Sequence, residues 1–208
     1  TLINTRYLGT HSFYKNDPTK FNVSISKYLV DMGDNPFANC IVAPFSTTVT
    51  ENFLGNEYVK TEYTFDLNRE IKIIDGSIYR VVPKGLELIC WTGDNIAIVA
   101  DGTVRISAMA FANQDIRQVV LPYTVAAIGH KAFYGCDKLI FVSFSSQKAP
   151  ILEEEYDNAY YESMENIPCA GDYDFQDYYG NPLIYSGQGV IPYFMWNVTS
   201  WSTNVYYG

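Results

Sequence analysis

Several kinds of functional residue are scarce or missing in this chain of 208 residues. It has only two histidines, and its four cysteines form neither a Cys-x-x-Cys pair nor the spacing of zinc ligands. The sequence contains no glycine-rich phosphate loop, no Gly-x-Ser-x-Gly elbow and no His-Glu-x-x-His helix. We therefore predict no cofactor, no zinc site and none of the common hydrolase mechanisms.

Basic residues are missing from the last part of the chain. Lys148 is the last Lys or Arg, and the acidic residues that follow it account for the whole net charge of −9. Residues 1–148 carry equal numbers of acidic and basic side chains. Because an acidic surface repels phosphate groups, we expect the protein to bind neither nucleic acid nor anionic lipid.

Long hydrophobic runs are also missing. No apolar segment reaches the roughly 18 residues that a membrane span needs, and no signal-peptide pattern is visible. Apolar residues make up 48% of the chain and charged residues 18%, a balance typical of a globular protein. The first residue is Thr1 rather than Met, so we expect a processed form or an excised piece of a longer protein.

Two consecutive segments in the middle of the chain, Val104–Pro122 and Val125–Phe144, are similar to each other. The matched positions are apolar or small, and they recur at an offset of 22 residues that becomes 23 after one insertion. The matched pairs are Ile106 and Ile128, Ala110 and Ala132, Phe111 and Phe133, Ile116 and Leu139, Val119 and Val142, and Leu121 and Phe144. A weaker third copy contains Phe37, Asn39 and Cys40. A repeat of this length predicts a solenoid, in which successive coils share one core.

Each copy is expected to contain one short strand, over 118–121 and over 141–144. Alternation then points Val119, Leu121, Val142 and Phe144 inward, and Gln118, Val120, Phe141 and Ser143 outward. The Ala-Phe pair of each copy is expected to fill the opposite wall of the coil. A helix is disfavoured because Pro122 and several β-branched residues interrupt the segment.

The repeat resembles the BspA-like leucine-rich repeats of bacterial surface and secreted proteins. The family pattern is approximately I-G-x-x-A-F-x-x-C-x-x-L-x-x-V-x-I-P, and the segment from Ile128 to Phe144 follows it closely. The preceding copy departs from it at Ser107 and Gln114. The segment from Asp75 to Tyr79, followed by Leu86, Leu88 and Ile89, resembles a β-hairpin that often interrupts the coil in this family. The resemblance is strong over about 96–146, weaker over 34–95, and absent from 1–33 and 149–208.

The resemblance implies a leucine-rich-repeat solenoid that is mainly β, with short parallel strands and short helical or irregular return segments. We predict an N-terminal cap over 1–33. The repeat region is expected over 34–148, with the hairpin inserted at about 55–95. Residues 149–208 are predicted to form an acidic, aromatic-rich C-terminal cap or a small β domain.

The aromatic C-terminal segment has two interpretations. It either packs as a β-rich cap over the last coil or forms a carbohydrate-binding platform around Trp196 and Trp201, because flat aromatic faces suit sugar rings. Asp172, Asp174 and Asp177 provide oxygen ligands of the kind that Ca²⁺ prefers, but they lack the spacing of an EF-hand loop. We therefore predict no metal site and keep these three carboxylates as a weak Ca²⁺ candidate.

Catalytic constellations are not expected. His130 lies at a variable repeat position and is predicted to be exposed, whereas Cys136 is predicted to be buried as a small hydrophobic residue. A Cys-His nucleophile pair is therefore disfavoured. The acidic residues Glu153–Glu155 are better explained by a solvated surface than by the two carboxylates of a glycosidase cleft. We predict that the chain is not an enzyme.

The sequence thus predicts a non-catalytic binding or adhesion module of a bacterial extracellular or cell-surface protein. Its partners are expected to be proteins or components of a host or cell surface, with polysaccharide as a further class. The outward residues Gln118, Val120, Phe141 and Ser143 form the predicted surface, since two of them are apolar. The alternatives are a carbohydrate-binding module that uses the C-terminal aromatic residues and a structural spacer in a larger surface or multi-enzyme assembly.

Overall fold

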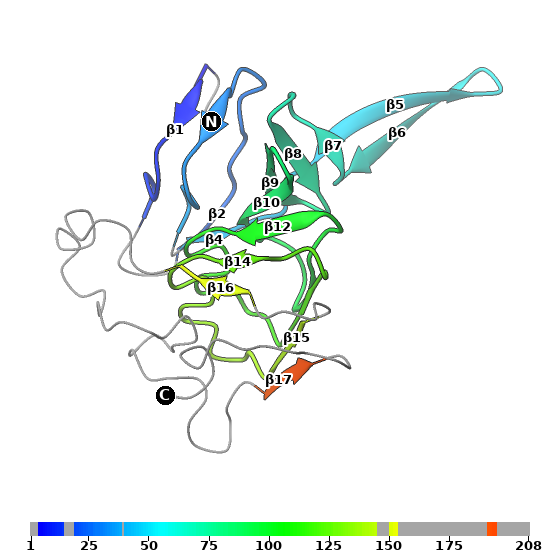
Figure 1. The fold of residues 1–208 in the computed structure, drawn as a ribbon. Helices are drawn as coiled ribbons and strands as arrows, with labels where there is room; N and C mark the ends of the chain where they lie inside the picture. Colours follow the sequence, from blue (N-terminus) through cyan, green and yellow to red (C-terminus); the bar gives the residue numbers. More distant parts are fainter. Residues whose placement is uncertain (1–3, 15–18, 39, 145–149, 154–190, 195–208) are drawn as a thin grey trace.

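The structure is a computed structural model that describes residues 4–14, 19–38, 40–144, 150–153 and 191–194 (Figure 1). The regular elements in these ranges are all β-strands, and no helix occurs among them. Two ladders of parallel strands run along the molecule and are joined by turns, which gives a solenoid of about six coils in the part of the chain described. The predicted fold class is confirmed, and the described return segments are irregular rather than helical.

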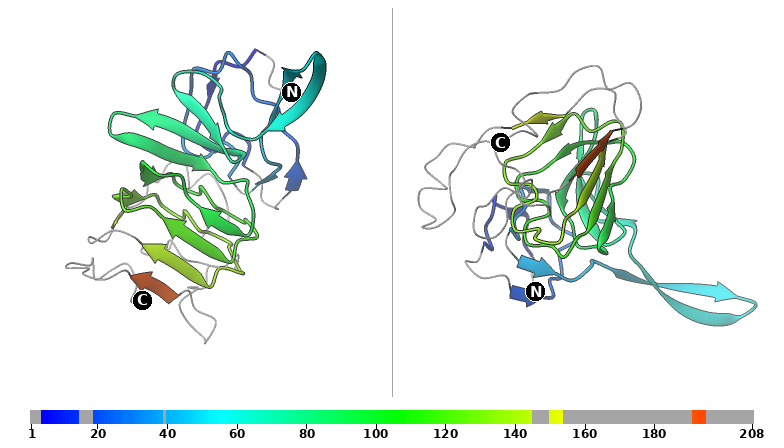
Figure 2. Two further views of the ribbon diagram at one scale, coloured as in Figure 1. Left: turned by 90° about the vertical axis from the view of Figure 1, so that its right-hand side faces the viewer. Right: turned by 90° about the horizontal axis from the view of Figure 1, so that it is seen from below.

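The first ladder belongs to a seven-stranded sheet. Its parallel strands are β10 (Gly85–Cys90), β12 (Thr103–Ile106), β14 (Ala127–Ile128) and β16 (Ile151–Leu152). The second ladder is a four-stranded sheet of β11 (Ile96–Ile98), β13 (Gln118–Leu121), β15 (Phe141–Phe144) and β17 (Ile191–Phe194). The chain alternates between the two sheets, and the strands stack coil upon coil (Figure 2).

The stacking of the two recognised repeats is as the sequence predicts. Val119 on β13 lies in register with Val142 on β15, and both side chains are buried. On the opposite wall, the rings of Phe111 and Phe133 stack with centroids 5.0 Å apart and an interplanar angle of 10°. Both rings are fully buried in the same hydrophobic cluster. One interior is therefore shared between consecutive coils.

The return turns are joined to each other by backbone hydrogen bonds. Phe111 N donates to Ala132 O at 2.8 Å, and the pattern continues with Asn113 N and Tyr134 O at 2.7 Å. Gly129 is required at the start of its turn, because a Cβ there would lie 2.3 Å from the backbone nitrogen of Ala108. This close approach of two backbones explains the glycine of the repeat pattern.

Ser107 departs from the repeat pattern for a structural reason. Its hydroxyl Oγ lies 2.8 Å from Oε1 of Glu87, a buried side chain on the neighbouring strand β10. Ser107 therefore lies beside a buried carboxylate of the preceding coil. A small polar side chain fits there, and it provides a hydrogen-bond partner for the carboxylate.

The N-terminal region also contains coils of the same type, which the sequence analysis did not recognise in residues 1–33. Strand β1 (Tyr7–Leu8) pairs in parallel with β3 (Asp31–Met32), and β2 (Thr19–Phe21) pairs in parallel with β4 (Cys40–Val42). The rings of Phe13 and Phe37 stack at 5.5 Å, as Phe111 and Phe133 do. Cys40 Sγ lies 3.2 Å from Phe13 O, and Cys136 Sγ lies 3.0 Å from Phe111 O. The assignment of residues 1–33 to a cap stays a prediction.

Antiparallel strands are inserted between the N-terminal coils and β10. The predicted turn at Asp75-Gly76 joins β8 (Ile71–Ile74) to β9 (Ser77–Val82), and both turn residues have positive φ values, 48° and 78°. Strand β7 (Phe65–Asp66) pairs with β8, and β9 pairs with β10. A second hairpin, which the sequence analysis did not single out, consists of β5 (Thr47–Phe53) and β6 (Asn56–Glu62) and extends away from the body (Figure 1).

Candidate recognition surface

The outer face of the four-stranded sheet carries the residues that the repeat pattern predicts to point outward. Gln118 is exposed, and Val120 and Ser143 are half-buried, whereas Val119 and Val142 are buried on the other face. The alternation of these side chains is therefore as predicted. Position 141 lies in register with Gln118, but the side chains of Phe141 and Phe144 lie outside the residues described.

Strand β11 extends this face by two residues that the sequence analysis missed. Ile96 and Ile98 are 50% and 66% exposed, and they lie in register with Gln118 and Val120. Ala97 between them is fully buried. The signal for these residues was the offset of 22 between Ile96 and Gln118, which continues the repeat upstream. It was obscured because Ile96, Ala97 and Ile98 are all apolar, so alternation alone does not identify the outward side.

A groove of about 530 Å³ borders the exposed side of β11. Its floor includes Trp91, whose ring packs on Phe111 at 5.8 Å and whose Nε1 donates to Asp94 O at 3.3 Å. A Cβ on Gly93 would lie 2.6 Å from this indole, so only glycine fits there without displacement. The described residues that line the groove are Pro44, Tyr63, Asp75, Trp91, Gly93, Asp94, Ile96 and Ile98.

Two carboxylates lie in this lining without a basic partner. Asp75 and Asp94 are exposed, and no Lys or Arg among the described residues forms an ion pair with either of them. Asp75 is held by Thr64, whose Oγ1 donates to its Oδ1 at 3.2 Å and accepts from its backbone N at 3.0 Å. The groove therefore combines apolar and aromatic walls with net negative charge.

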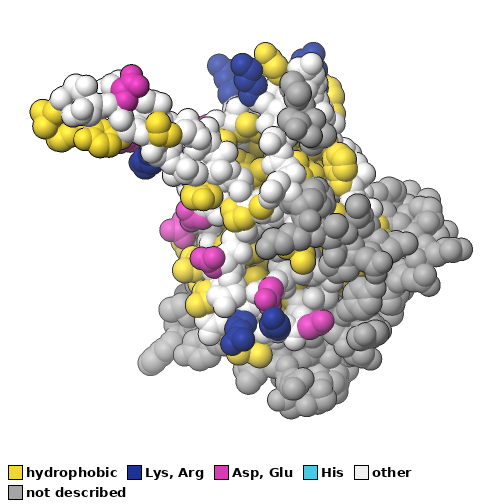
Figure 3. All heavy atoms as spheres, turned by 180° about the vertical axis from the view of Figure 1, so that it is seen from behind, with side chains coloured by type: hydrophobic (Ala, Val, Ile, Leu, Met, Phe, Trp, Pro, Cys, Tyr) yellow, Lys and Arg dark blue, Asp and Glu magenta, His cyan; other side chains and the backbone are white. Residues whose placement is uncertain are grey.

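The β5–β6 hairpin is exposed along most of its length. Phe53, Leu54, Tyr58 and Val59 are between 53% and 86% exposed. Figure 3 shows hydrophobic side chains gathered on the projecting arm and, further down, on the body below its base. Lys60 lies between Glu51 and Glu62 at 3.5 and 3.1 Å, and the hydrogen bond to Glu62 together with both carboxylates raises its pKa.

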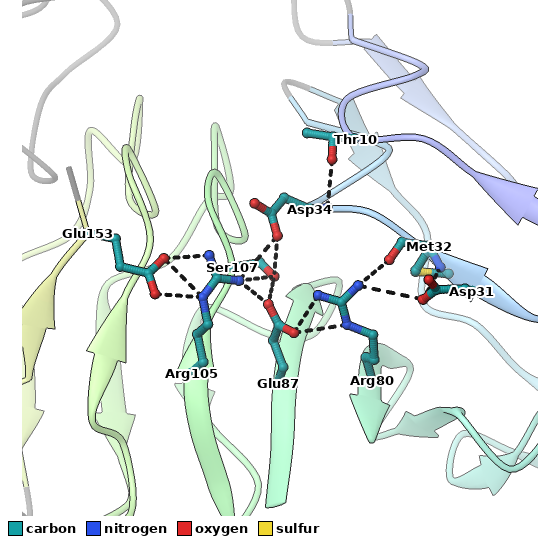
Figure 4. Close-up of polar contacts among 9 residues, drawn as sticks. All are labelled: Thr10, Asp31, Met32, Asp34, Arg80, Glu87, Arg105, Ser107 and Glu153. Carbon is teal, nitrogen blue, oxygen red and sulfur yellow. Dashed lines mark hydrogen bonds and ion pairs between the residues drawn. The ribbon is translucent and has the colours of Figure 1, made fainter. Parts of the chain in front are cut away.

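A network of charged residues joins the N-terminal coils to the seven-stranded sheet (Figure 4). Glu87 on β10 is almost fully buried, and it binds Arg80 on β9 at 2.6 Å and Arg105 on β12. Arg105 also binds Asp34 of the N-terminal region at 3.2 Å and makes a bidentate contact with Glu153. The contacts of Arg105 with Asp34 and Glu153 connect residues far apart in sequence. We therefore interpret the network as a structural joint that holds the N-terminal coils against the seven-stranded sheet.

The charge state of this joint follows from two opposing effects. Burial on its own lowers the pKa of Arg105, but the hydrogen bonds to Glu153 and the charges of Asp34 and Glu87 outweigh burial, so the pKa is raised. The pKa of Arg80 is raised in the same way, chiefly by Glu87. Both guanidinium groups are therefore cationic at every physiological pH, and neither of them is available as a general acid or base.

The structure corrects the prediction for His130. This side chain is 6% exposed rather than solvent-exposed, because residue 130 lies in the return turn that packs beneath the turn of the preceding coil: its carbonyl accepts from Met109 N at 3.1 Å. The prediction for Cys136 is confirmed, since it is fully buried, and burial raises the pKa of its thiol. A thiol with a raised pKa is a poor nucleophile.

The candidate residues of the C-terminal segment lie outside the described residues: Asp172, Asp174, Asp177, Trp196 and Trp201. Their roles stay predictions. Within the described ranges, no group of three or more His, Cys, Asp or Glu side chains has a metal-binding arrangement. No helical segment in the described part of the chain is long and apolar enough to cross a bilayer.

Comparison with known families agrees with this architecture. The family model described as a BspA type leucine rich repeat region, in six copies, matches residues 99–172. The chain carries a BspA-type leucine-rich-repeat region. The match covers coils whose stacking is described above, including the paired rings of Phe111 and Phe133. A comparison with curated proteins found no match to this chain.

One solved structure is similar to this chain. It is a leucine rich cell surface protein from Faecalibacterium prausnitzii A2-165, with 17% sequence identity and a TM-score of 0.43. The alignment covers 63% of this chain and 31% of the other, so the matched part spans about a third of that protein's length.

Proposed function

We propose that this chain is a non-catalytic recognition module of a bacterial extracellular or cell-surface protein. Its contact surface is the outer face of the four-stranded sheet, with Gln118, Val120, Phe141 and Ser143 from the repeats and Ile96 and Ile98 from β11. The BspA-type repeat region supports this class of protein. The partner is a protein or another component of a cell surface.

One observation supports this proposal most directly. Ile96 and Ile98 are 50% and 66% exposed on a face that is otherwise regular and held by the packed interior. Neighbouring exposed apolar side chains on a rigid sheet are typical of a contact surface, since solvent exposure of apolar area is unfavourable. The described outward positions Ile96, Ile98, Gln118, Val120 and Ser143 contain no His, Cys or carboxylate, so none of these five side chains could act as the general base that activates the Ser143 hydroxyl.

A binding screen with surface variants tests the proposal. The full chain is labelled and applied to an array of purified extracellular-matrix and cell-surface proteins and to a glycan array. We expect at least one protein on the array to bind the chain. The variants Val120→Lys and Phe141→Ala should each weaken that binding at least tenfold. The melting temperature of Val120→Lys should be the same as that of the parent chain. Val59→Lys, at an exposed apolar position on the hairpin, is the matched control and should bind as the parent chain does.

The two alternative functions correspond to different results of the same screen. Binding only to glycans, with loss in Trp196→Ala and Trp201→Ala, would replace the protein-recognition proposal by the carbohydrate-binding alternative. An absence of binding on both arrays would favour the structural spacer. Protein binding that is equal in the parent chain and in Val120→Lys and Phe141→Ala would remove this face as the contact surface.

A further inference from the structure

The four-stranded sheet ends at a strand whose second edge has no neighbouring strand among the residues that the structure describes. Its order is β11-β13-β15-β17, so β11 is paired only with β13. The corresponding strands of the N-terminal coils, β2 and β4, pair with each other and form a separate sheet. The ladder is therefore interrupted between β4 and β11, at the place where the antiparallel strands are inserted in the chain.

The hydrogen-bond pattern shows which peptide groups of β11 face the open edge. Asn95 O accepts from Gln118 N, and Val99 N donates to Val120 O. In a parallel pair, alternate residues bond to the same neighbour. The odd-numbered residues therefore bond to β13, and the N–H and C=O groups of Ile96 and Ile98 point away from it. No hydrogen bond from these groups to another described residue is present.

The groove described above lies beside this edge. Ile96 and Ile98 form one of its sides, and the lining also includes Pro44 and Tyr63. Because proline has no backbone N–H, Pro44 cannot donate a backbone hydrogen bond to the open edge of β11. A volume of about 530 Å³ is within the range of natural ligand pockets, which is roughly 300–1,000 Å³. The site thus has an open strand edge, apolar contacts and room for a ligand.

The charge of the groove identifies the class of segment that fits it. Asp75 and Asp94 are the charged residues in the described part of its lining, where neither forms an ion pair with a Lys or Arg. The chain's own segment after Lys148 contains no Lys or Arg and is acidic, so charge repulsion disfavours it as the occupant. A segment with Lys or Arg between apolar residues complements both the carboxylates and the apolar walls.

We propose that the open edge of β11 binds an extended, positively charged segment of a partner protein as an added strand. The peptide groups of Ile96 and Ile98 bond to the backbone of that segment, and Asp75 and Asp94 pair with its basic side chains. Strand addition of this kind takes affinity from the main chain and specificity from alternate side chains. The inference rests on the proposed recognition function and specifies one site and one class of partner for it.

A defined peptide tests the proposal without knowledge of the natural partner. The probe is a six-residue peptide of alternating lysine and valine with acetylated and amidated ends, titrated into the full chain and followed by amide chemical shifts. We expect saturable shifts at the amides of Ile96 and Ile98. N-methylation of alternate peptide nitrogens, which removes the bonding edge, should weaken binding at least tenfold, and replacing lysine by glutamate should abolish it.

Variants of the protein separate the edge from the charges. Ile98→Pro removes one edge N–H and should reduce affinity at least tenfold, since this N–H does not bond to β13. Asp75→Asn and Asp94→Asn should each weaken binding about three- to tenfold at low salt and reduce its salt dependence. Asp101→Asn and Ile140→Lys, at an exposed acidic and an exposed apolar position outside the groove lining, are the matched controls and should bind normally.

Several results would overturn the inference. These are equal binding of the N-methylated peptide, equal binding of the glutamate peptide, and shifts that map away from β11. Concentration-dependent dimerisation that Ile98→Pro abolishes would replace the partner segment by a second copy of the chain. Oligosaccharide binding at this groove without peptide binding would overturn it as well. The peptide could fail to bind while Val120→Lys still weakens binding to a protein on the array. In that case the proposed recognition function stands, and only the binding site at the edge of β11 is rejected.

Discussion

The stacked coils and the β5–β6 hairpin are both made of β-strands, but they differ in what surrounds the strands. In the coils every strand from β12 to β15 has a parallel neighbour on both sides, and inward side chains such as Ile106, Val119 and Val142 are buried. In the hairpin, β5 and β6 pair only with each other among the described strands, and most of their side chains are exposed on both faces. A two-stranded hairpin in water is marginally stable by itself. Because the coils bury their side chains and the hairpin does not, we expect the stability of the fold to come from the stacking of the coils.

The largest difference in the free energy of unfolding is expected when one phenylalanine in each region is replaced by alanine. Phe133→Ala creates a cavity in the fully buried ring stack and should lower the free energy of unfolding by about 4 kcal/mol. Phe53→Ala, at 66% exposure on the hairpin, should change it by less than about 0.5 kcal/mol. Chemical denaturation of both variants measures the two values. Similar losses in the two variants would contradict the division between a packed and an unpacked region.

The ion network provides the next test, because it lies between the N-terminal coils and the sheet. Glu87→Ala leaves Arg80 and Arg105 partly buried without their shared carboxylate and should destabilise the protein by about 3 kcal/mol. The control Glu57→Ala removes an exposed carboxylate of the hairpin and should have an effect near zero. Thermal and denaturant unfolding compare the two. A loss below about 1 kcal/mol for Glu87→Ala would show that Asp34 and Glu153 suffice to hold Arg105.

A buried histidine in the coils is expected to make the stability of the fold depend on pH, whereas the hairpin contains no histidine. Burial lowers the pKa of His11 from its ordinary value of 6.5 to about 4, although the nearby Asp34 carboxylate opposes this shift. The folded state therefore binds fewer protons than the unfolded state in this window. The contribution of His11 is complete above pH 6.5 and is lost as the pH falls towards 4, by up to about 3 kcal/mol.

Unfolding measured between pH 7 and pH 4 tests this expectation. His11→Asn removes the titrating group and keeps a residue that tolerates the positive φ of 51° at this position. The stability of the variant should fall less steeply over the window than that of the parent chain. Equal slopes in the two proteins would show that His11 titrates normally in the folded state.

The smallest effect is expected at the tip of the hairpin. Leu54 and Gly55 have φ values of 50° and 81°, the combination required by a type I′ turn, for which Asn-Gly is preferred. Leu54→Asn should therefore slow amide hydrogen exchange in β5 and β6 severalfold. The global free energy of unfolding should stay within about 0.5 kcal/mol, because the hairpin contributes little to it. A clear change in global stability would show that the arm and the coils unfold as one unit.

Much of the coil architecture was predictable from local sequence patterns. Val119 and Val142 recur at the same repeat position, and the structure places them in register on neighbouring strands. Phe111 and Phe133 likewise occupy equivalent places. Leu8, Gly9 and Phe13 carry the same signal as Ile128, Gly129 and Phe133, but without the Ala before Phe13 the N-terminal coil was not recognised. A repeat becomes harder to identify when its small positions change.

Other features depend on contacts that no local pattern reports. Ile96 and Ile98 became candidate surface residues only when their register with Gln118 and Val120 was known. The burial of His130 follows from the turn of the preceding coil. The groove at β11 brings together Pro44, Tyr63, Asp75 and Asp94 from separate parts of the chain, and spacing in the sequence does not predict such a meeting.

The sequence by itself determined the solenoid, because each repeat exposes an apolar face that only another repeat can cover. It also determined the inward and outward sides of the repeat strands, since alternation along a strand is a local property. Only the tertiary structure decided where the ladder is interrupted, which peptide groups remain open at β11, and which carboxylates lie beside them. These depend on how distant segments pack, because the inserted strands interrupt the stacking that the repeats would otherwise continue.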